Sequence, residues 1–192
     1  MYVLSAEGFK GARVTLLLIT ANIIFFISFN PAFDQNIFYL FVQNNDRIIN
    51  HFEYWRLFTA MFLHYDILHI FSNMFALLFF GTFIEYNFSK LAFIGLYFIS
   101  GLIGNIFSLI FLPLNINSLG ASGCIFGLIG AALVIIIKQK NRILLMLAGA
   151  YVVYFVVSSF LPGVNFYAHI FGLLGGFIFG YLLKRKEEIA RY

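Results

Sequence analysis

The feature that most restricts the fold of this chain is a succession of six apolar stretches, each about long enough to cross a lipid bilayer as a helix, which takes roughly 20 residues. They cover approximately residues 14–33, 66–84, 91–112, 121–137, 143–161 and 166–183. Only 10% of the 192 residues are charged, whereas soluble proteins average roughly 25%. We therefore predict an all-α membrane protein in which residues 1–192 form a single polytopic domain, a bundle of six transmembrane helices.

The Lys and Arg residues predict the orientation of the bundle, because these residues are enriched in cytoplasmic loops. Six spans place both termini on one side, and ten of the 12 basic residues fall there: Lys10, Arg13, Lys90, Lys138, Lys140, Arg142, Lys184, Arg185, Lys186 and Arg191. Arg47 and Arg56 fall on the other side. We therefore expect both termini to be cytoplasmic. The charges are scattered at the ends of apolar stretches, so the net charge of +4 does not indicate nucleic-acid binding.

A long loop, about residues 34–65, joins the first two spans on the side opposite the termini. It is rich in aromatic side chains: Phe38, Tyr39, Phe41, Phe52, Tyr54 and Trp55. Such side chains favour the boundary between lipid and water. We expect the loop to lie partly in the headgroup layer and to contain short helical pieces.

Four strongly polar residues lie in the predicted spans, near the non-cytoplasmic ends: His69, Asn73, Ser122 and His169. A polar side chain inside a membrane carries a free-energy cost, so each is a candidate functional residue. Because all four lie at a similar depth, a single site on that side could contain them.

Each of these residues also has a purely structural interpretation. His69 and Asn73 share a helix face, where they could join helices by hydrogen bonds or donate to an anion. Ser122 opens a helix within a Gly-Ala-Ser-Gly sequence, where it could act as an N-cap or lie beside free N–H groups that favour a developing oxyanion. His169 could be a buried neutral histidine bonded to a carbonyl.

Small residues predict how two of the spans pack. Glycines recur every four residues in the fourth and sixth spans: Gly123 and Gly127, and Gly172, Gly176 and Gly180. Such stripes allow membrane helices to approach closely. If the two stripes face each other, Ser122 and His169 become neighbours.

A serine beside a histidine suggests nucleophilic catalysis, because the hydroxyl needs a base to remove its proton and imidazole is the usual base. The fourth and sixth spans contain no Asp or Glu to orient His169, and Asp66 and Glu85 bracket the second span. The prediction is therefore a Ser122–His169 dyad rather than a triad.

The single cysteine, Cys124, is interpreted as a small apolar packing residue.

Two other function classes fit less well. A zinc protease would need a motif such as His-Glu-x-x-His, which the sequence lacks, so no metal site and no other cofactor are predicted. A transporter or channel would place its polar residues along a path through the membrane, whereas these residues gather at one depth.

Five short motifs occur in order along the chain. They are Trp55-Arg56, His64-x4-His69-x3-Asn73, Gly81-x3-Glu85, Gly120-Ala121-Ser122-Gly123 and Ala168-His169-x2-Gly172. Each lies at its proper place in the predicted topology. Together they resemble the rhomboid family of intramembrane serine proteases, in its simple six-helix bacterial form, over about residues 53–180.

The resemblance implies a serine endopeptidase that cuts single-span membrane proteins in or near the transmembrane segment. Ser122 would be the nucleophile and His169 the general base, with an oxyanion hole formed by His69, Asn73 and the N–H of Ser122. Residues expected to support the structure are Trp55, Arg56, His64, Glu85 and Phe126. The resemblance also implies a bacterial inner (plasma) membrane location, with the lipid bilayer and single-span substrates as partners, and a gate formed by the fifth span and residues 162–168.

Two positions depart from the family pattern. Phe126 replaces a tyrosine that often packs against the catalytic histidine, so ring packing is retained without a hydroxyl bond. The residues after Glu85, Tyr86-Asn87-Phe88-Ser89, lack the glycine usual in this turn. Because both Ser122 and His169 are present, we favour an active protease over a relative that binds membrane proteins without cutting them.

Overall fold

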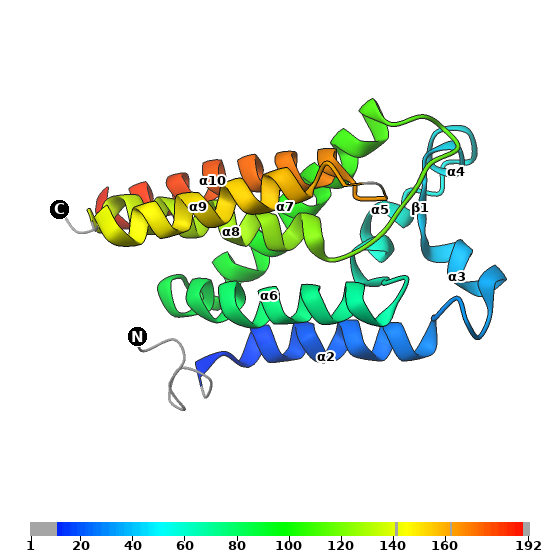
Figure 1. The fold of residues 1–192 in the computed structure, drawn as a ribbon, viewed down its shortest axis with the longest axis horizontal. Coiled ribbons are helices and arrows are strands. Elements are labelled where there is room, and N and C mark those ends of the chain that lie inside the picture. The colour runs from blue at the N-terminus through cyan, green and yellow to red at the C-terminus, as the bar shows by residue number, and fades with distance from the viewer. Residues whose placement is uncertain (1–10, 141, 162, 190–192) are drawn as a thin grey trace.

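The computed structural model describes residues 11–140, 142–161 and 163–189, which are mostly helical (Figure 1). The long helices are α2 (Arg13–Ser28), α6 (Ile67–Asn87), α7 (Lys90–Phe111), α8 (Ser122–Lys138), α9 (Arg142–Ser158) and α10 (Phe166–Ile189). Shorter elements are α3 (Gln35–Phe41), β1 (Gln43–Asn44), α4 (Asn45–His51), α5 (Arg56–Thr59), the 3-10 helix η2 (Ala60–Phe62) and β2 (Asn117–Ser118). The short elements gather at one end of the bundle, at the right of Figure 1.

Within these residues, three helices are long and apolar enough to cross a membrane: Ile67–Asn87, Lys90–Phe111 and Phe166–Lys186. Three more apolar helices are shorter: Arg13–Ser28, Ser122–Lys138 and Leu145–Ser158. The predicted helical class with membrane-spanning candidates is therefore confirmed. The number of six spans and the single domain stay predictions.

The first helix is shorter than the predicted span of residues 14–33. α2 stops at Ser28, and Phe29 is its C-cap. Pro31 has no N–H to continue a helix and disfavours helical geometry in the residue before it. The side chain of Asn30 then accepts a hydrogen bond of 2.8 Å from the N–H of Ala32, which turns the chain away from the helix axis.

α8 lies at the centre of the helices, and most of its residues are buried. A side chain at Gly172 of α10 would collide with the carbonyl oxygen of Gly123. One at Gly176 would collide with the carbonyl oxygen of Gly127. The predicted contact between the two glycine stripes is confirmed, and main chain meets main chain along it.

Glu85, near the end of α6, holds the start of α2. Its carboxylate accepts hydrogen bonds from the N–H of Val14 at 2.9 Å and from the N–H of Thr15 at 2.8 Å. It also accepts one from the hydroxyl of Thr15 at 2.8 Å. The first N–H groups of a helix have no partner within the helix, so this carboxylate caps α2 from a distant part of the chain.

The start of α2 and the far ends of α6 and α10 lie at the same end of the molecule (Figure 1). Nζ of Lys184 on α10 donates to the carbonyl oxygen of Asn87 at 2.8 Å. Lys10 and Arg191, which contribute to the predicted orientation, lie outside the described residues. That this end faces the cytoplasm stays a prediction.

Arg56 organises the loop between α2 and α6. Its side chain is buried, and its Nη1 donates to the carbonyl oxygens of Tyr39 at 2.6 Å and Val42 at 2.9 Å. Its Nε donates to Glu53 Oε2 at 2.5 Å. A charged hydrogen bond of this kind is stronger than a neutral one. The guanidinium therefore holds Tyr39, Val42 and Glu53 of the loop together.

β1 and β2 join this loop to the segment that leads into α8. The two short strands pair antiparallel, with Gln43 opposite Ser118 and Asn44 opposite Asn117. The pairing places the long first loop directly beside the residues that precede Ser122.

Candidate active site

Ser122 is the first residue of α8, after a turn that only glycine suits. Gly120 has a φ of +119°, which residues with a side chain rarely adopt, and its N–H donates to the carbonyl oxygen of Ala60 at 2.9 Å. A Cβ at Gly120 would lie only 2.9 Å from Nε2 of His69. The turn therefore lets the imidazole of His69 come close to the start of α8.

His169 lies in the first turn of α10, and its Nε2 is 2.8 Å from Oγ of Ser122. His169 is 9% exposed, and its imidazole stacks on the ring of Phe126, with ring centroids 4.1 Å apart. The structure thus brings the two predicted catalytic side chains into hydrogen-bond contact.

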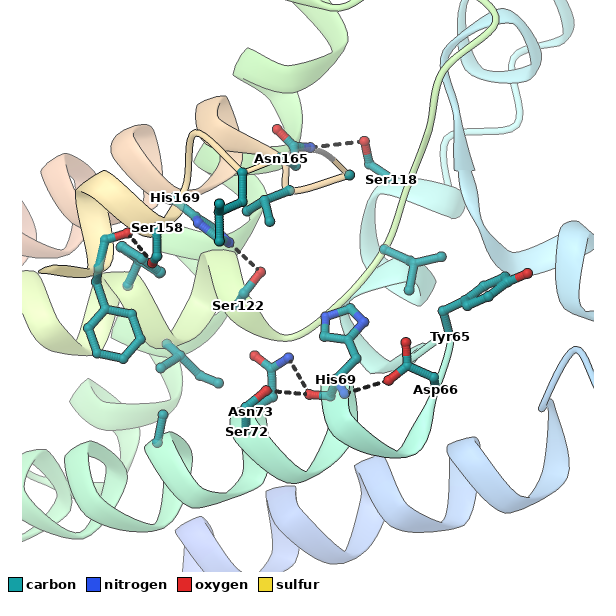
Figure 2. A pocket seen from close by; sticks show the side chains of 18 of the residues that line it. Tyr65, Asp66, His69, Ser72, Asn73, Ser118, Ser122, Ser158, Asn165 and His169 are labelled. Atoms are coloured by element: carbon teal, nitrogen blue, oxygen red, sulfur yellow. Dashed lines mark hydrogen bonds between the residues drawn. The ribbon is translucent and has the colours of Figure 1, made fainter.

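The start of α10 is held by Asn165. Its Oδ1 accepts from the N–H of Ala168 at 3.0 Å and from the hydroxyl of Ser108 at 3.1 Å. Its Nδ2 donates to the hydroxyl of Ser118 at 2.9 Å (Figure 2). This residue caps the helix that carries His169 and ties it to α7 and β2.

A second contact of His169 was not predicted from the sequence. Oγ of Ser159, just beyond α9, is 2.6 Å from Nδ1 of His169. Serine and asparagine are common at helix ends, so neither Ser159 nor Asn165 carries a signal in the sequence that distinguishes it from a capping residue.

His69 and Asn73 lie on the face of α6 that is turned toward Ser122 (Figure 2). Asp66 caps this helix, because its Oδ1 accepts from the N–H of His69 at 2.8 Å. Nδ2 of Asn73 donates to the carbonyl oxygen of His69 at 2.9 Å. An amide nitrogen carries two protons, so Asn73 can make a further hydrogen bond to a ligand.

All four polar candidates from the predicted spans line one cavity of about 560 Å³. Its walls come from α6 and the two residues before it, the segment before α8, the first turns of α8 and α10, the end of α9, and residues 163–165 between α9 and α10 (Figure 2). Ligand sites in proteins have a similar size and the same mixture of apolar walls with a few polar groups. In the described part of the chain, no three His, Cys, Asp or Glu side chains lie together as metal ligands would.

The residues expected to support the site lie at different distances from it. His64 is buried with its ring against that of His69, 5.0 Å between centroids. Burial lowers the pKa of His64 to about 3, so this imidazole is neutral at physiological pH. Arg56, Glu85 and Trp55 do not line the cavity, and the Trp55 side chain is exposed.

Residues 51–186 match the family model for the rhomboid domain. The chain belongs to the rhomboid family. This rhomboid is 37% identical over 147 residues to RHOMBOID-like protein 6, mitochondrial, of Arabidopsis thaliana, a match that covers 74% of this chain and 48% of the plant protein. It is 35% identical over 144 residues to the rhomboid protein YdcA of Bacillus subtilis (strain 168), covering 71% of this chain and 70% of YdcA. The match thus spans about half of the plant relative.

Rhomboid proteins are integral membrane proteins, and they are typically intramembrane serine proteases. One relative, 34% identical over 134 residues, is named Inactive RHOMBOID-like protein 8 of Arabidopsis thaliana. Whether a given rhomboid cuts peptide bonds therefore depends on the residues of its own site.

Proposed function

We propose that this rhomboid is an intramembrane serine endopeptidase that cleaves single-span membrane proteins in or near their transmembrane segment. The observation that carries the proposal is the 2.8 Å contact between Oγ of Ser122 and Nε2 of His169 at the wall of a cavity. A serine that only capped α8 would occupy the N-cap position, and here Ala121 holds it. The hydroxyl of Ser122 is directed to an imidazole instead.

In the proposed reaction, Oγ of Ser122 attacks the scissile carbonyl carbon while Nε2 of His169 accepts its proton. The carbonyl π electrons move onto the oxygen. The imidazolium then protonates the leaving amide nitrogen as the C–N bond breaks, which leaves an acyl ester on Ser122. Water, deprotonated by the same imidazole, attacks this ester; the bond between Oγ and the acyl carbon then breaks, the imidazolium returns the proton to Oγ of Ser122, and the second product leaves as a carboxylic acid.

The oxyanion of each tetrahedral intermediate would be stabilised from two sides. The backbone N–H of Ser122 lies at the start of α8, where the helix dipole favours negative charge. The side chains of His69 and Asn73 face the same cavity from α6. Donors fixed in place before the reaction stabilise the developing charge without having to reorganise.

The position of the cavity supports the proposed topology. The starts of α8 and α10, which carry Ser122 and His169, lie away from the end of the molecule where α2 begins and α10 ends (Figure 1). With those ends cytoplasmic, as the basic residues indicate, water and substrate would reach Ser122 from the non-cytoplasmic part of a bacterial inner membrane.

A rhomboid that binds membrane proteins without cutting them is the alternative, because one relative is named inactive. The direct contact of Ser122 with His169 favours the protease, since binding alone requires no such pair.

Cleavage of a single-span model substrate by the purified protein in detergent tests the proposal. We expect Ser122→Ala and His169→Ala each to reduce cleavage to background, and a fluorophosphonate probe to label Ser122. Undiminished cleavage by Ser122→Ala would overturn the assignment.

A further inference from the structure

Ser159 lies between His169 and the last turn of α9. Its side chain is 1% exposed, and its Oγ is 2.6 Å from Nδ1 of His169. The same Oγ is 2.7 Å from the carbonyl oxygen of Phe155. A hydroxyl carries a single proton, so it donates to only one of these two neighbours.

The carbonyl oxygen of Phe155 can only accept, which decides the direction of both bonds. If Ser159 donated to Nδ1, two oxygens with no proton between them would face each other at 2.7 Å. If Ser159 donates to Phe155, its oxygen is free to accept from Nδ1–H of His169. The second arrangement places a proton in each of the two contacts of Ser159, one toward the carbonyl oxygen of Phe155 and one from Nδ1 of His169.

The proton on Nδ1 has a direct consequence for the other ring nitrogen. A neutral imidazole has one N–H, so protonation of Nδ1 leaves a lone pair on Nε2. Nε2 is the atom 2.8 Å from Oγ of Ser122, where a general base needs that lone pair. A histidine in the opposite tautomer would present an N–H to Ser122 and could not accept its proton.

We propose that Ser159 is a positioning residue that holds His169 in the Nδ1–H tautomer, in the place that an aspartate occupies in a catalytic triad. This inference rests on the proposed function and deepens it: the Ser122–His169 pair becomes part of a hydrogen-bonded row that continues through Ser159 to the Phe155 carbonyl. The orienting group is a neutral hydroxyl, which suits a region of the protein where a buried carboxylate would be costly.

The hydrogen-bonded row also links the catalytic pair to α9. The ring of Phe155 packs edge-on against Phe126, with centroids 5.7 Å apart, and Phe126 stacks on His169. The end of α9 is therefore linked to His169 directly, through the hydrogen bond of Ser159, and indirectly, through the packing of Phe155 on Phe126.

Ser158, which lines the cavity, provides a matched control for the ring tautomer of His169. Its hydroxyl donates to the same carbonyl oxygen of Phe155, at 2.8 Å. Ser158→Ala thus removes an equivalent hydroxyl from the same helix end and leaves the bond between Ser159 and His169 in place. Thermal unfolding of each variant in detergent shows that it is folded before rates are compared.

The first test measures kcat and KM for the model substrate. We expect Ser159→Ala to lower kcat by about 10–100-fold, the range found when the hydrogen-bond partner of a metal-ligating histidine is removed, with KM nearly unchanged. Ser159→Thr, which retains the hydroxyl, should recover most of kcat. Equal kcat values for the parent and a folded Ser159→Ala variant would overturn the proposal.

The second test does not depend on activity. Nitrogen-15 NMR of protein labelled at its four histidines reports which ring nitrogen carries the proton, and loss of one signal set in His169→Gln assigns His169. We expect Nδ1–H in the parent and in Ser158→Ala, and a mixture with Nε2–H in Ser159→Ala. An Nε2–H tautomer in the parent would overturn the role of Ser159.

The two proposals can fail separately. If the parent neither cleaves substrate nor reacts with the fluorophosphonate, the protease proposal fails, while the tautomer still decides whether Ser159 orients His169.

Discussion

The ring of Phe126 lies parallel to the imidazole of His169, with 4.1 Å between the centroids and 11° between the planes. Aromatic pairs of this kind contribute about 0.5–1.5 kcal/mol beyond the area that they bury. The stacking therefore helps to keep the imidazole in the plane where Nε2 meets Ser122.

We predict that Phe126→Leu lowers kcat by about 2–10-fold, because the aliphatic side chain fills the space but gives the imidazole no flat surface. Phe126→Tyr keeps the ring and should retain most of the activity. Initial rates at saturating substrate provide the measurement. A leucine variant as fast as the parent would show that the stacking does not orient His169.

Removal of Asn73 tests the proposed oxyanion hole. One oxyanion donor is worth about 3 kcal/mol in other serine proteases, so Asn73→Ala should lower kcat by about 100-fold and remain measurable above the Ser122→Ala background. Asn87→Ala is a matched control, because Nδ2 of Asn87 makes the same type of bond, to the carbonyl oxygen of Phe83 at 2.8 Å, at the far end of α6. If both variants lose activity equally, the effect belongs to the helix rather than to an oxyanion.

Asn165 is expected to affect both stability and rate. Asn165→Ala removes a helix cap, which costs about 0.5–2 kcal/mol, and its links to Ser108 and Ser118 as well. We predict a lower thermal unfolding temperature and a reduced kcat, since the first turn of α10 carries His169. Asn165→Asp keeps both acceptor bonds and loses only the hydrogen bond donated to Ser118. Its unfolding temperature and kcat should therefore lie between those of the parent and those of Asn165→Ala. An alanine variant with parental kcat and stability would contradict this role.

The contact between α8 and α10 predicts a sharp difference between two glycines. A side chain at Gly176 would strike the main chain of Gly127, which cannot move aside as a flexible side chain could, so Gly176→Ala should prevent stable folding. A methyl group added at Gly149 in α9 would meet nothing within 4 Å, so Gly149→Ala should be neutral or stabilise the helix by up to about 1 kcal/mol. Thermal unfolding of both variants in the same detergent compares them directly; equal stability would mean that the two helices can separate.

The polar residues of the site can be identified from the sequence because they interrupt apolar segments that are predicted to span the membrane. A histidine or an asparagine within an apolar helix is unfavourable, and His69, Asn73 and His169 therefore stand out without any structure. The glycine stripes predict the relative placement of α8 and α10, since a stripe of small residues has few uses other than close packing.

The contact of Ser159 with His169 could not be predicted from the sequence. The residue expected to orient a catalytic histidine is a carboxylate, and the fourth and sixth spans contain none. The orienting hydroxyl comes instead from the end of α9, and the neighbouring Ser158 has the same side chain and the same carbonyl partner. The direction of the backbone at the end of α9 determines which of the two serines lies next to Nδ1 of His169. The spacing of residues in the sequence does not predict that direction.

The length and burial of α8 have a consequence for the lipid around the protein. Its 17 residues span about 25 Å, less than the roughly 30 Å of a hydrocarbon core. Because neighbouring helices rather than acyl chains surround most of α8, this shortfall creates little hydrophobic mismatch with the bilayer. Bilayers of different thickness will therefore tilt the outer helices first, while the distance between Ser122 and His169 is set within the protein.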